Sequence, residues 1–304
     1  MVDAFVETDL SAVLFLYVET SLHVGTDAGI SLIDLPIQRE RTTQHPLILG
    51  SGIKGVLRSQ AKAMHADQAE ITLGFGAERE AAGVQFSQGA LSFGNAQIVL
   101  FPVRSLFDIF AYVTCPLVLA RVARNLHSAG IATALGELSA LDGQNARSTT
   151  VSTISFEGNA VLEEFTFRTT PDSAVDAWAS WLAKHAVPTY SGDTGSYWRD
   201  KLQSSLIVLS DDAFRDFVIH STELATQIKL DIDTKTVSNG ALWTQESLPP
   251  DTLLMSALSV DLKRANGALL TWLQGVCGQR AHFGGDETTG QGVVSMRWQI
   301  GNPS

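Results

Sequence analysis

Apolar runs alternate along the chain with segments of helical spacing, and this alternation predicts an α+β fold. Residues 12–19, AVLFLYVE, form a β-rich apolar run that fits a buried strand. A helix is expected to start near Ser51, because the apolar residues that follow recur at helical spacing: Ile53, Val56, Leu57, Ala61 and Met64. The same spacing places Lys54, Arg58 and Lys62 on one basic stripe, which we expect to face away from the core.

The pattern beyond residue 90 continues to interleave strands and helices. Strands are expected at residues 91–103 (one or two), 160–169, 258–262 and 293–300, and helices at residues 116–126, 173–186 and 265–276. Residues 227–254 alternate polar and apolar positions around Ser238, Asn239 and Gly240, which predicts a projecting hairpin arm. Residues 77–89, 143–158 and 188–195 are polar or glycine-containing and are expected to be exposed loops.

Composition indicates a globular chain of one large domain or two. It has 304 residues, of which 45% are hydrophobic and 17% charged. The sequence has no apolar run long enough to cross a bilayer, and its first ten residues carry three acids where a signal peptide needs basic charge, so a cytoplasmic location is expected. The two cysteines, Cys115 and Cys277, form no CxxC pair, which excludes a disulfide framework and a zinc knuckle.

The charge is unevenly distributed. A net charge of -11 argues against a protein that covers its whole surface with nucleic acid. Residues 34–62 nevertheless carry five bases and two acids, so this segment is +3 while the remainder is -14. The segment is either a directed anion-binding surface or a solvated helix face.

The glycines of GSGIKG match the spacing GxGxxG at the expected helix start: Gly50, Gly52 and Gly55. In dinucleotide-binding folds this pattern seats a pyrophosphate. The match is weak, because the preceding HPLIL is short and no second strand ends in an acid about 20 residues on. A dinucleotide site and a more general anion-binding surface share one physical element. Unpaired backbone amides at a helix start attract phosphate, and Lys54 and Arg58 add positive charge.

Asp34 is the strongest candidate for chemistry. It lies in IDLPIQRER, where Pro36 fixes its own φ and holds Leu35 extended, so the carboxylate stands on a stiff turn. A carboxylate beside a phosphodiester can hold a divalent cation or help to deprotonate a ribose 2′-hydroxyl. The alternative is a structural Asp34 that caps a turn or pairs with Arg39 or Arg41.

His23 lies next to the same loop and is a candidate acid or base, with a hydrogen-bonded structural histidine as the alternative. The seven histidines show no HxH or HExxH spacing, which argues against a protein-built zinc site. The sequence also contains no GxSxG and no GxxxxGK[ST], so the commonest hydrolase and nucleotide-triphosphatase signatures are absent.

Four segments together resemble a known family. They are LIDLPIQRERTTQHPLILGSGIKGVLRS, LFPVRSLFDIFAYVTCPLVLAR, LDIDTKTVSNGALWTQESLPPDT and the terminal GGDETTGQG. In this order they are similar to the RAMP superfamily of CRISPR proteins, and more narrowly to the repeated backbone subunits of type III-B (Cmr) RNA-guided effector complexes. The resemblance spans residues 14–298.

The resemblance implies a single domain over residues 1–304. Its fold would be an RRM-like (ferredoxin-like) palm with inserted helical elements and a projecting β-hairpin thumb at about residues 226–254. Copies of the chain would stack head to tail along a guide RNA, together with other Cmr-type subunits. The assembly would be an endoribonuclease that cleaves bound target RNA at regular intervals with a divalent metal ion, Mg or Mn.

The resemblance also assigns site residues. Asp34 would be catalytic and would hold the metal, with His23 as the matching histidine and Glu246 as a weaker thumb acid, because Thr244 and Gln245 precede it. RNA contacts would come from Arg39, Arg41, Gly50, Ser51, Gly52, Lys54 and Arg58, and from Gly284, Gly285, Thr288 and Gly290. In the terminal loop, missing side chains allow close approach of backbone and RNA, and a plain turn is the alternative. An inactive RNA-binding scaffold and a dinucleotide-binding enzyme remain the alternative functions.

Overall fold

The computed structural model describes residues 9–26, 33–64, 67–77, 87–189, 194–230, 237–276 and 279–301. The strands are β1 (Asp9–Val18), β2 (Leu47–Ile48), β3 (Leu91–Phe93), β4 (Ala96–Arg104), β5 (Phe110–Thr114), β6 (Asn145–Ser148), β7 (Asn159–Leu162), β8 (Phe165–Pro171), β9 (Leu206–Val208), β10 (Glu223–Leu230), β11 (Val237–Ser247), β12 (Leu253–Asp261), β13 (Arg280–His282) and β14 (Val293–Ile300). The helices are α1 (Gly50–Ala63), α2 (Gln68–Phe75), α3 (Pro116–Ser128), α4 (Ser173–His185), α5 (Thr194–Ser205), α6 (Asp211–His220), α7 (Gly267–Val276) and the 3₁₀ helix η1 (Glu287–Thr289).

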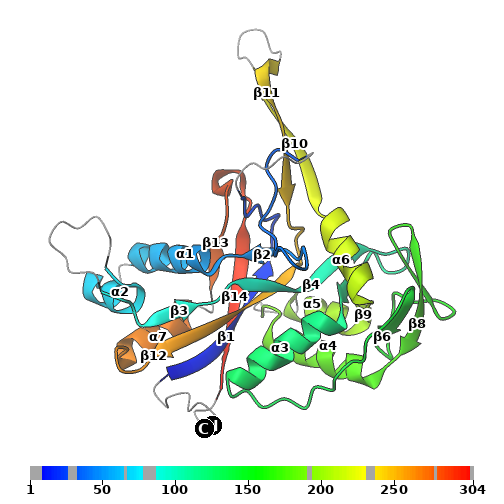
Figure 1. The fold of residues 1–304 in the computed structure, drawn as a ribbon, viewed down its shortest axis with the longest axis horizontal. Helices are drawn as coiled ribbons and strands as arrows, with labels where there is room; N and C mark the ends of the chain where they lie inside the picture. Colours follow the sequence, from blue (N-terminus) through cyan, green and yellow to red (C-terminus); the bar gives the residue numbers. More distant parts are fainter. Residues whose placement is uncertain are drawn as a thin grey trace.

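One large mixed sheet forms the body, and the two-stranded hairpin β10–β11 projects from it (Figure 1). The sheet order is β13-β14-β1-β12-β4-β5-β9-β6-β8-β7, with β2 paired to β4 and β3 to β12. The four strands β14-β1-β12-β4 are antiparallel neighbours, and the chain visits them in the order β1, α1, β4, β12, α7, β14. Strands β1 and β12 are therefore the two inner strands of this group.

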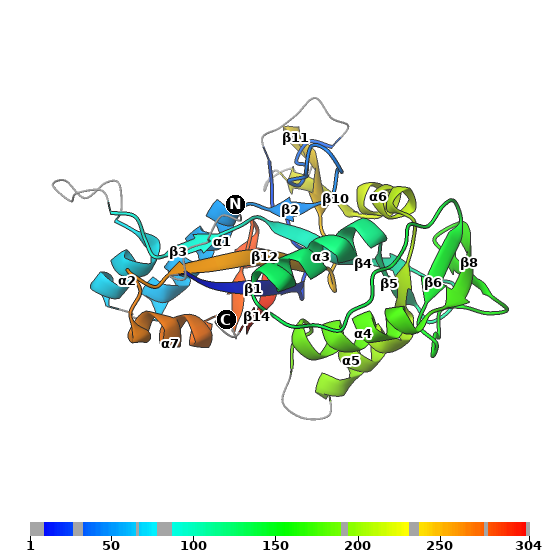
Figure 2. The same ribbon diagram turned by 60° about the horizontal axis from the view of Figure 1, so that its bottom comes forward.

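Strand β1 is buried on both faces, which explains its continuous apolar sequence. Side chains alternate between the faces of a strand, so Leu14 and Leu16 enter one core while Phe15 enters another. The first core includes Leu57 of α1 and residues of α7, and the second includes Trp178 of α4. Figures 1 and 2 show α1, α2 and α7 at one end of the body, and α4 and α5 toward the other.

Most of the elements predicted from spacing are confirmed. The central strand, the helix near Ser51, the later helices and the final strand lie where the periodicity predicted them, and residues 91–103 form two strands. The expected loop at residues 143–158 is wrong in part, because it contains β6. That short polar strand is defined by pairing with β8 and β9 rather than by its own composition. Residues 78–86 and 190–193 of the other two expected loops lie outside the described residues.

The hairpin differs from its prediction in two ways. Ser238, Asn239 and Gly240 lie inside β11, at a register shift of the β10–β11 pairing, and not at the end of the hairpin. Turn-forming residues therefore mark an irregularity in the strand, as a β-bulge does. The paired hairpin also spans residues 223–247 rather than 227–254, because Leu253 already belongs to β12 in the body.

Two further features bear on the expectations from composition. Cys115 is a buried free thiol, whereas Cys277 lies outside the described residues. Within the described part of the chain, none of the helices combines the length and apolar character that a bilayer-spanning segment needs.

A buried hydroxyl network joins β1 to the turn before β12. The Tyr17 hydroxyl donates to Asp251 Oδ1 at 2.6 Å and lies 3.0 Å from the Tyr112 hydroxyl. Asp251 has a φ of 70°, in the left-handed region that favours Gly, Asn and Asp. Burial raises the pKa of Asp251 above its ordinary value.

We predict that Asp251→Asn stabilises the protein at pH 7 and changes little at pH 3.5. A raised folded-state pKa means that the protonated carboxyl is favoured in the fold, so stability is lost as pH rises through that pKa. Asn keeps an acceptor for Tyr17, tolerates the left-handed φ and carries no charge. Thermal unfolding across this pH range should show a Tm gain of roughly 2 °C that appears only toward neutral pH. A gain that is the same at both pH values would contradict the argument.

Candidate functional site

The base of β11 is where segments from distant parts of the sequence meet. Leu35 N–H donates to Thr244 O, and Glu246 N–H donates to Leu35 O, both at 3.0 Å. Two residues farther along, Leu248 exchanges two backbone hydrogen bonds of 2.9 Å with Leu22. Alternate residues of a strand present their backbone groups to the same edge. One edge of β11 therefore holds both segments that contain the predicted catalytic residues.

Asp34 lies at this edge with its carboxylate exposed. Asp34 Oδ2 accepts from the Thr244 N–H at 2.7 Å and from the Thr244 hydroxyl at 3.0 Å. The backbone hydrogen bond, followed by the hydroxyl one, lowers the pKa of Asp34, so the carboxylate stays ionised. Among the described residues, none donates a hydrogen bond to Oδ1. Thr244 is thus the residue that orients Asp34.

His23 is held by the next residue of the same edge. Its Nδ1 lies 2.6 Å from the backbone oxygen of Glu246. A carbonyl oxygen only accepts, so Nδ1 is the donor, and in the neutral tautomer with this hydrogen bond Nε2 is the acceptor. Thr244 and Glu246 are two residues apart on an extended strand, so the anchors of Asp34 and His23 are about 7 Å apart. The structure therefore brings these two candidates to one place.

Glu246 is brought to the same place but is buried, with 2% of its surface exposed. Its Oε1 accepts from Arg39 at 2.5 Å and from the Thr222 hydroxyl at 2.9 Å. Its Oε2 accepts from the Ile37 N–H at 3.0 Å. Three protein donors satisfy this carboxylate, so its geometry is that of an internal anchor.

Arg39 points into the protein and not toward solvent. In addition to Glu246, its guanidinium donates to the backbone oxygens of Gln44 at 2.9 Å and Val218 at 2.8 Å. The side chain is 15% exposed. Arg39 thus ties the Asp34 segment to α6, and a contact with an outside ligand would require these bonds to break.

The terminal glycine-rich loop packs directly on His23. The Gly285 N–H donates to the His23 backbone oxygen at 3.1 Å. Gly284 has a φ of +74°, and a Cβ there would lie 2.1 Å from the same oxygen, so a larger residue would displace His23. Gln245 Nε2 donates to Asp286 Oδ2 at 2.6 Å, which fixes the loop to β11.

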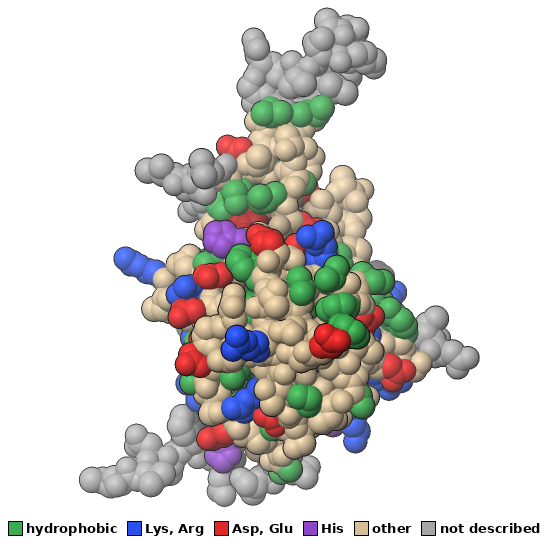
Figure 3. All heavy atoms as spheres, turned by 90° about the vertical axis from the view of Figure 1, so that its right-hand side faces the viewer, with side chains coloured by type: hydrophobic (Ala, Val, Ile, Leu, Met, Phe, Trp, Pro, Cys, Tyr) green, Lys and Arg blue, Asp and Glu red, His purple; other side chains and the backbone are tan. Residues whose placement is uncertain are grey.

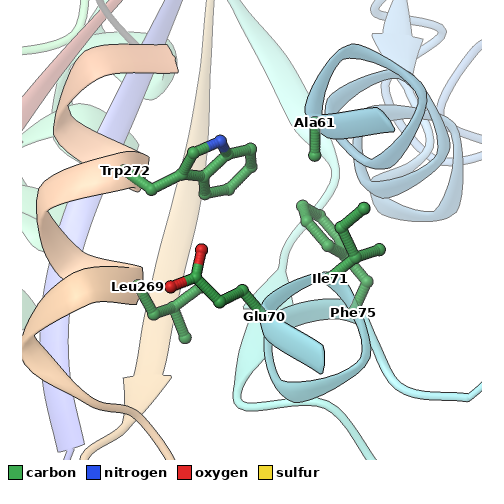
Figure 4. Close-up of a pocket in the computed structure, with 6 residues that line it drawn as sticks. All are labelled: Ala61, Glu70, Ile71, Phe75, Leu269 and Trp272. Carbon is green, nitrogen blue, oxygen red and sulfur yellow. The ribbon is translucent and has the colours of Figure 1, made fainter. Parts of the chain in front are cut away.

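The start of α1 is also shaped by packing. Gly50 is buried, its N–H donates to Asn95 Oδ1 at 3.0 Å, and a Cβ would lie 2.2 Å from the Phe93 backbone oxygen. The first glycine of GxGxxG is therefore required by the neighbouring strand and does not offer its amide to a pyrophosphate. The gap between α1, α2 and α7 has no room for a ligand either, because side chains fill it. Figure 4 shows its side chains, Trp272 among them, facing one another.

The basic stripe of α1 differs from its prediction. Lys54 Nζ donates to Leu91 O at 3.3 Å, and Arg58 Nη2 donates to Gly76 O at 3.0 Å, so both side chains lie partly buried against neighbouring backbone. Burial, and then the charge of Arg58, lowers the pKa of Lys54. Only Lys62 of the three is exposed. The stripe does not face away from the core, because α2 and β3 pack beside it and their carbonyls take its donors.

Other predicted contact residues do lie at the surface. They are Arg41, Ser51, Gly52, Thr288 and Gly290, and all five are exposed. Gly290 has a φ of +84° with open space around its Cα, so the turn at the end of η1 accounts for this glycine.

A metal ion at this site would need coordinating groups both from the protein and from a bound ligand. Among the described residues, no three His, Cys, Asp or Glu side chains are grouped to hold one. Asp34 offers a single exposed carboxylate. Mg²⁺ commonly binds through one or two carboxylates and completes its shell with water and substrate phosphates. The residues present fit an ion held jointly by Asp34 and a phosphate-bearing ligand.

Comparison with known proteins supports the resemblance seen in the sequence. Residues 15–295 match the family model of the RAMP superfamily. The chain is 35% identical over 285 residues to the CRISPR system Cmr endoribonuclease Cmr4 of Pyrococcus furiosus, covering 92% of this chain and 93% of that protein. It is 26% identical over 302 residues to the CMR subunit Cmr4 of Saccharolobus solfataricus, covering 93% and 95%.

The fold is similar as well. A crystal structure of oligomeric Cmr4 from Pyrococcus furiosus superimposes with a TM-score of 0.72 at 30% identity, covering 96% of this chain and 98% of that one. The chain therefore belongs to the RAMP superfamily.

Proposed function

We propose that this chain is a subunit of a type III-B RNA-guided effector, binds guide RNA in head-to-tail copies with other Cmr-type subunits, and cleaves bound target RNA at regular intervals. One observation carries the proposal: the same edge of β11 anchors an ionised, exposed Asp34 and a His23 that is fixed through Nδ1. The similarity to an endoribonuclease over most of the chain supports it.

We infer that residues 1–304 form one domain with an RRM-like palm. The antiparallel order β14-β1-β12-β4, joined through α1 and α7, is the split βαβ arrangement and supports this inference. Helices α3 to α6 and their strands would be the insertion, and the hairpin β10–β11 would be the thumb. The site then lies where the thumb leaves the palm, the place at which a bound RNA strand would be bent.

The residues suggest a specific cleavage reaction. The ribose 2′-oxygen forms a bond to the adjacent phosphorus while the bond from phosphorus to the 5′-oxygen breaks, which leaves a cyclic phosphate and a 5′-hydroxyl. His23 Nε2 accepts the 2′-hydroxyl proton, and the leaving oxygen takes a proton from solvent. A Mg or Mn ion held by Asp34 and the phosphate would neutralise the charge that develops there. Base pairing to the guide supplies sequence recognition, so the protein needs only to hold the backbone.

We assign Glu246 a positioning role instead of the chemical one suggested by the resemblance. Its carboxylate is satisfied by Arg39, Thr222 and Ile37, while its backbone oxygen fixes the His23 tautomer. RNA contacts fall to the exposed residues, Arg41 in particular. Lys54 and Arg58 add positive charge from partly buried positions.

We predict that Asp34→Asn lowers the cleavage rate of the assembled complex by roughly 10²- to 10³-fold with guide binding unchanged. Asn keeps an acceptor for both Thr244 hydrogen bonds, so only the charge is lost. Fragment ladders from a labelled target RNA measure the effect. Asp212→Asn, which removes an exposed acid on α6, is the matched control.

Wild-type ladders from the Asn variant would instead identify the chain as an inactive scaffold. The same assay tests the metal: EDTA should stop cleavage by the wild type, and Mg²⁺ or Mn²⁺ should restore it. Full activity in EDTA would show that cleavage does not need a metal ion. The role of Asp34 would then be judged from the Asp34→Asn variant alone.

Thr244→Val is expected to raise the pKa of Asp34. The variant removes the hydroxyl donor and keeps the stronger backbone one, so the change should be partial. An NMR titration of the carboxyl carbon reads it directly. Thr226→Val, the cross-strand neighbour of Thr244, should leave the titration unchanged. Identical curves for all three proteins would show that the hydroxyl does not influence the carboxylate.

Arg41→Gln should weaken RNA binding and flatten its salt dependence. Each phosphate contact contributes about 0.7 to 0.9 to the slope of log K against log salt, so one lost contact should reduce the slope by that amount. Filter binding at several salt concentrations measures it. Arg215→Gln is the control, because Arg215 is paired with Asp212 and Asp216 on α6. An unchanged slope would show that Arg41 makes no phosphate contact.

A further inference from the structure

An open groove lies between α6, the β7–β8 turn and the loop before β6, with a volume of about 1270 Å³. Its floor is aromatic. Phe165 and Phe167 of β8 each place their ring centroid 6.0 Å from that of Phe217 of α6. Phe167 and Phe217 are buried, whereas Phe165 is 49% exposed. The groove therefore has room for a ligand and presents an aromatic ring to it.

Carboxylates from all three elements border this floor. They are Asp142, Glu163, Glu164, Asp211, Asp212 and Asp216. Arg104 pairs with Glu163. Arg215 pairs with Asp212 and Asp216. With these two arginines counted and the histidine of the groove neutral, the six acids leave a net charge of -4. Figure 3 looks onto this end of the molecule and shows acidic and hydrophobic side chains next to one another.

Two of the acids are available to a ligand. Asp142 and Glu164 are exposed, and neither forms an ion pair within the described part of the chain. Asp211, by comparison, already accepts a hydrogen bond from the Leu117 N–H at 3.0 Å. Because Asp142 lies in the loop before β6 and Glu164 in the β7–β8 turn, a ligand that meets both needs two separated positive charges.

The chemistry of the groove narrows the class of ligand. Its net negative charge repels RNA and other anions. A metal ion is disfavoured as well, because among the described residues no three acids, histidines or cysteines are grouped to hold one. A hydrated ion would also leave the exposed ring of Phe165 in contact with water. An extended cation whose charges are separated by apolar segments matches both the rim and the floor.

We propose that this groove binds a linear aliphatic polyamine. Its ammonium groups pair with Asp142 and Glu164, and its methylene segments cover Phe165, whose ring face also attracts a cation. The protein uses the same combination internally. The Lys201 ammonium lies 3.1 Å from Asp108 Oδ2 and 4.5 Å from the centre of the Phe110 ring. A carboxylate and a phenyl ring together thus already satisfy one alkylammonium group in this fold.

The groove also reaches the residues that hold the candidate site. Thr222 lines the groove, and its hydroxyl donates to Glu246 at 2.9 Å. Glu246 in turn holds His23 through its backbone oxygen. A polyamine in the groove would therefore lie beside this anchor and away from the Asp34 carboxylate. The inference concerns the chain alone and does not depend on RNA cleavage.

Isothermal titration calorimetry of the full chain with spermidine at low salt tests the proposal. One molecule should bind per chain. Glu164→Gln and Asp142→Asn should each weaken binding about fivefold, as expected for the loss of one exposed ion pair. Phe165→Ser should weaken it through the floor, without a change in charge. Asp200→Asn, which removes an exposed acid of α5 outside the groove, is the matched control and should bind like the wild type.

Two further ligands and a stability measurement sharpen the test. Butylamine has one charge and should bind at least tenfold more weakly than spermidine. Thermal unfolding with spermidine should raise Tm for the wild type and the Asp200→Asn control more than for the groove variants, since a ligand stabilises the state that binds it. Unliganded Tm values that match the wild type would show that the rim variants remain folded.

The opposite results are equally clear. Equal binding by the wild type and the groove variants would show that spermidine is only a diffuse counterion of an acidic protein, and would overturn the proposal. Binding of a lysine-rich peptide at the groove without binding of spermidine would identify a protein-docking surface instead, and would also overturn it. Loss of cleavage by the assembled complex leaves this titration unaffected, so the two proposals fail separately.

Discussion

The arrangement of the candidate site depends on hydrogen bonding along one edge of β11. That edge receives Leu35 and Leu22 through backbone bonds and His23 through its ring. The alternation of backbone groups along a strand then spaces the Asp34 and His23 anchors two residues apart. The base of the projecting hairpin thus anchors two segments of the β1–β2 connection, one around His23 and one around Asp34.

Glu246 makes this frame rigid, although burying a carboxylate is unfavourable unless every oxygen finds a partner. Its partners come from two separate segments: Arg39 and Ile37 beside Asp34, and Thr222 just before the hairpin. Removing any one of them leaves a buried charge undersatisfied. The buried ion pair therefore gives the site a single geometry, while the exposed Asp34 remains free to meet a ligand.

Several cations of this acidic chain are used for internal structure. Lys54 and Arg58 bind backbone carbonyls, Arg39 pairs with Glu246, and Lys201 holds the β4–β5 turn. Other bases among the described residues, such as Arg41, Lys62 and Arg124, lie exposed at the surface, but they are spread over several elements. Affinity for RNA would then come from many copies acting together, with modest contributions from each.

The sequence by itself determined the element types with strong periodicity, the family, and the stiff segment that carries Asp34, because local spacing and backbone restriction encode all three. Only the tertiary structure decided that Thr244 orients Asp34, that Glu246 is buried and that the basic stripe lies against α2 and β3. The hydrogen bonds from Thr244 to Asp34 and from Ile37 to Glu246 join residues 210 and 209 positions apart. No local pattern records such pairings, because the register of a folded sheet creates them.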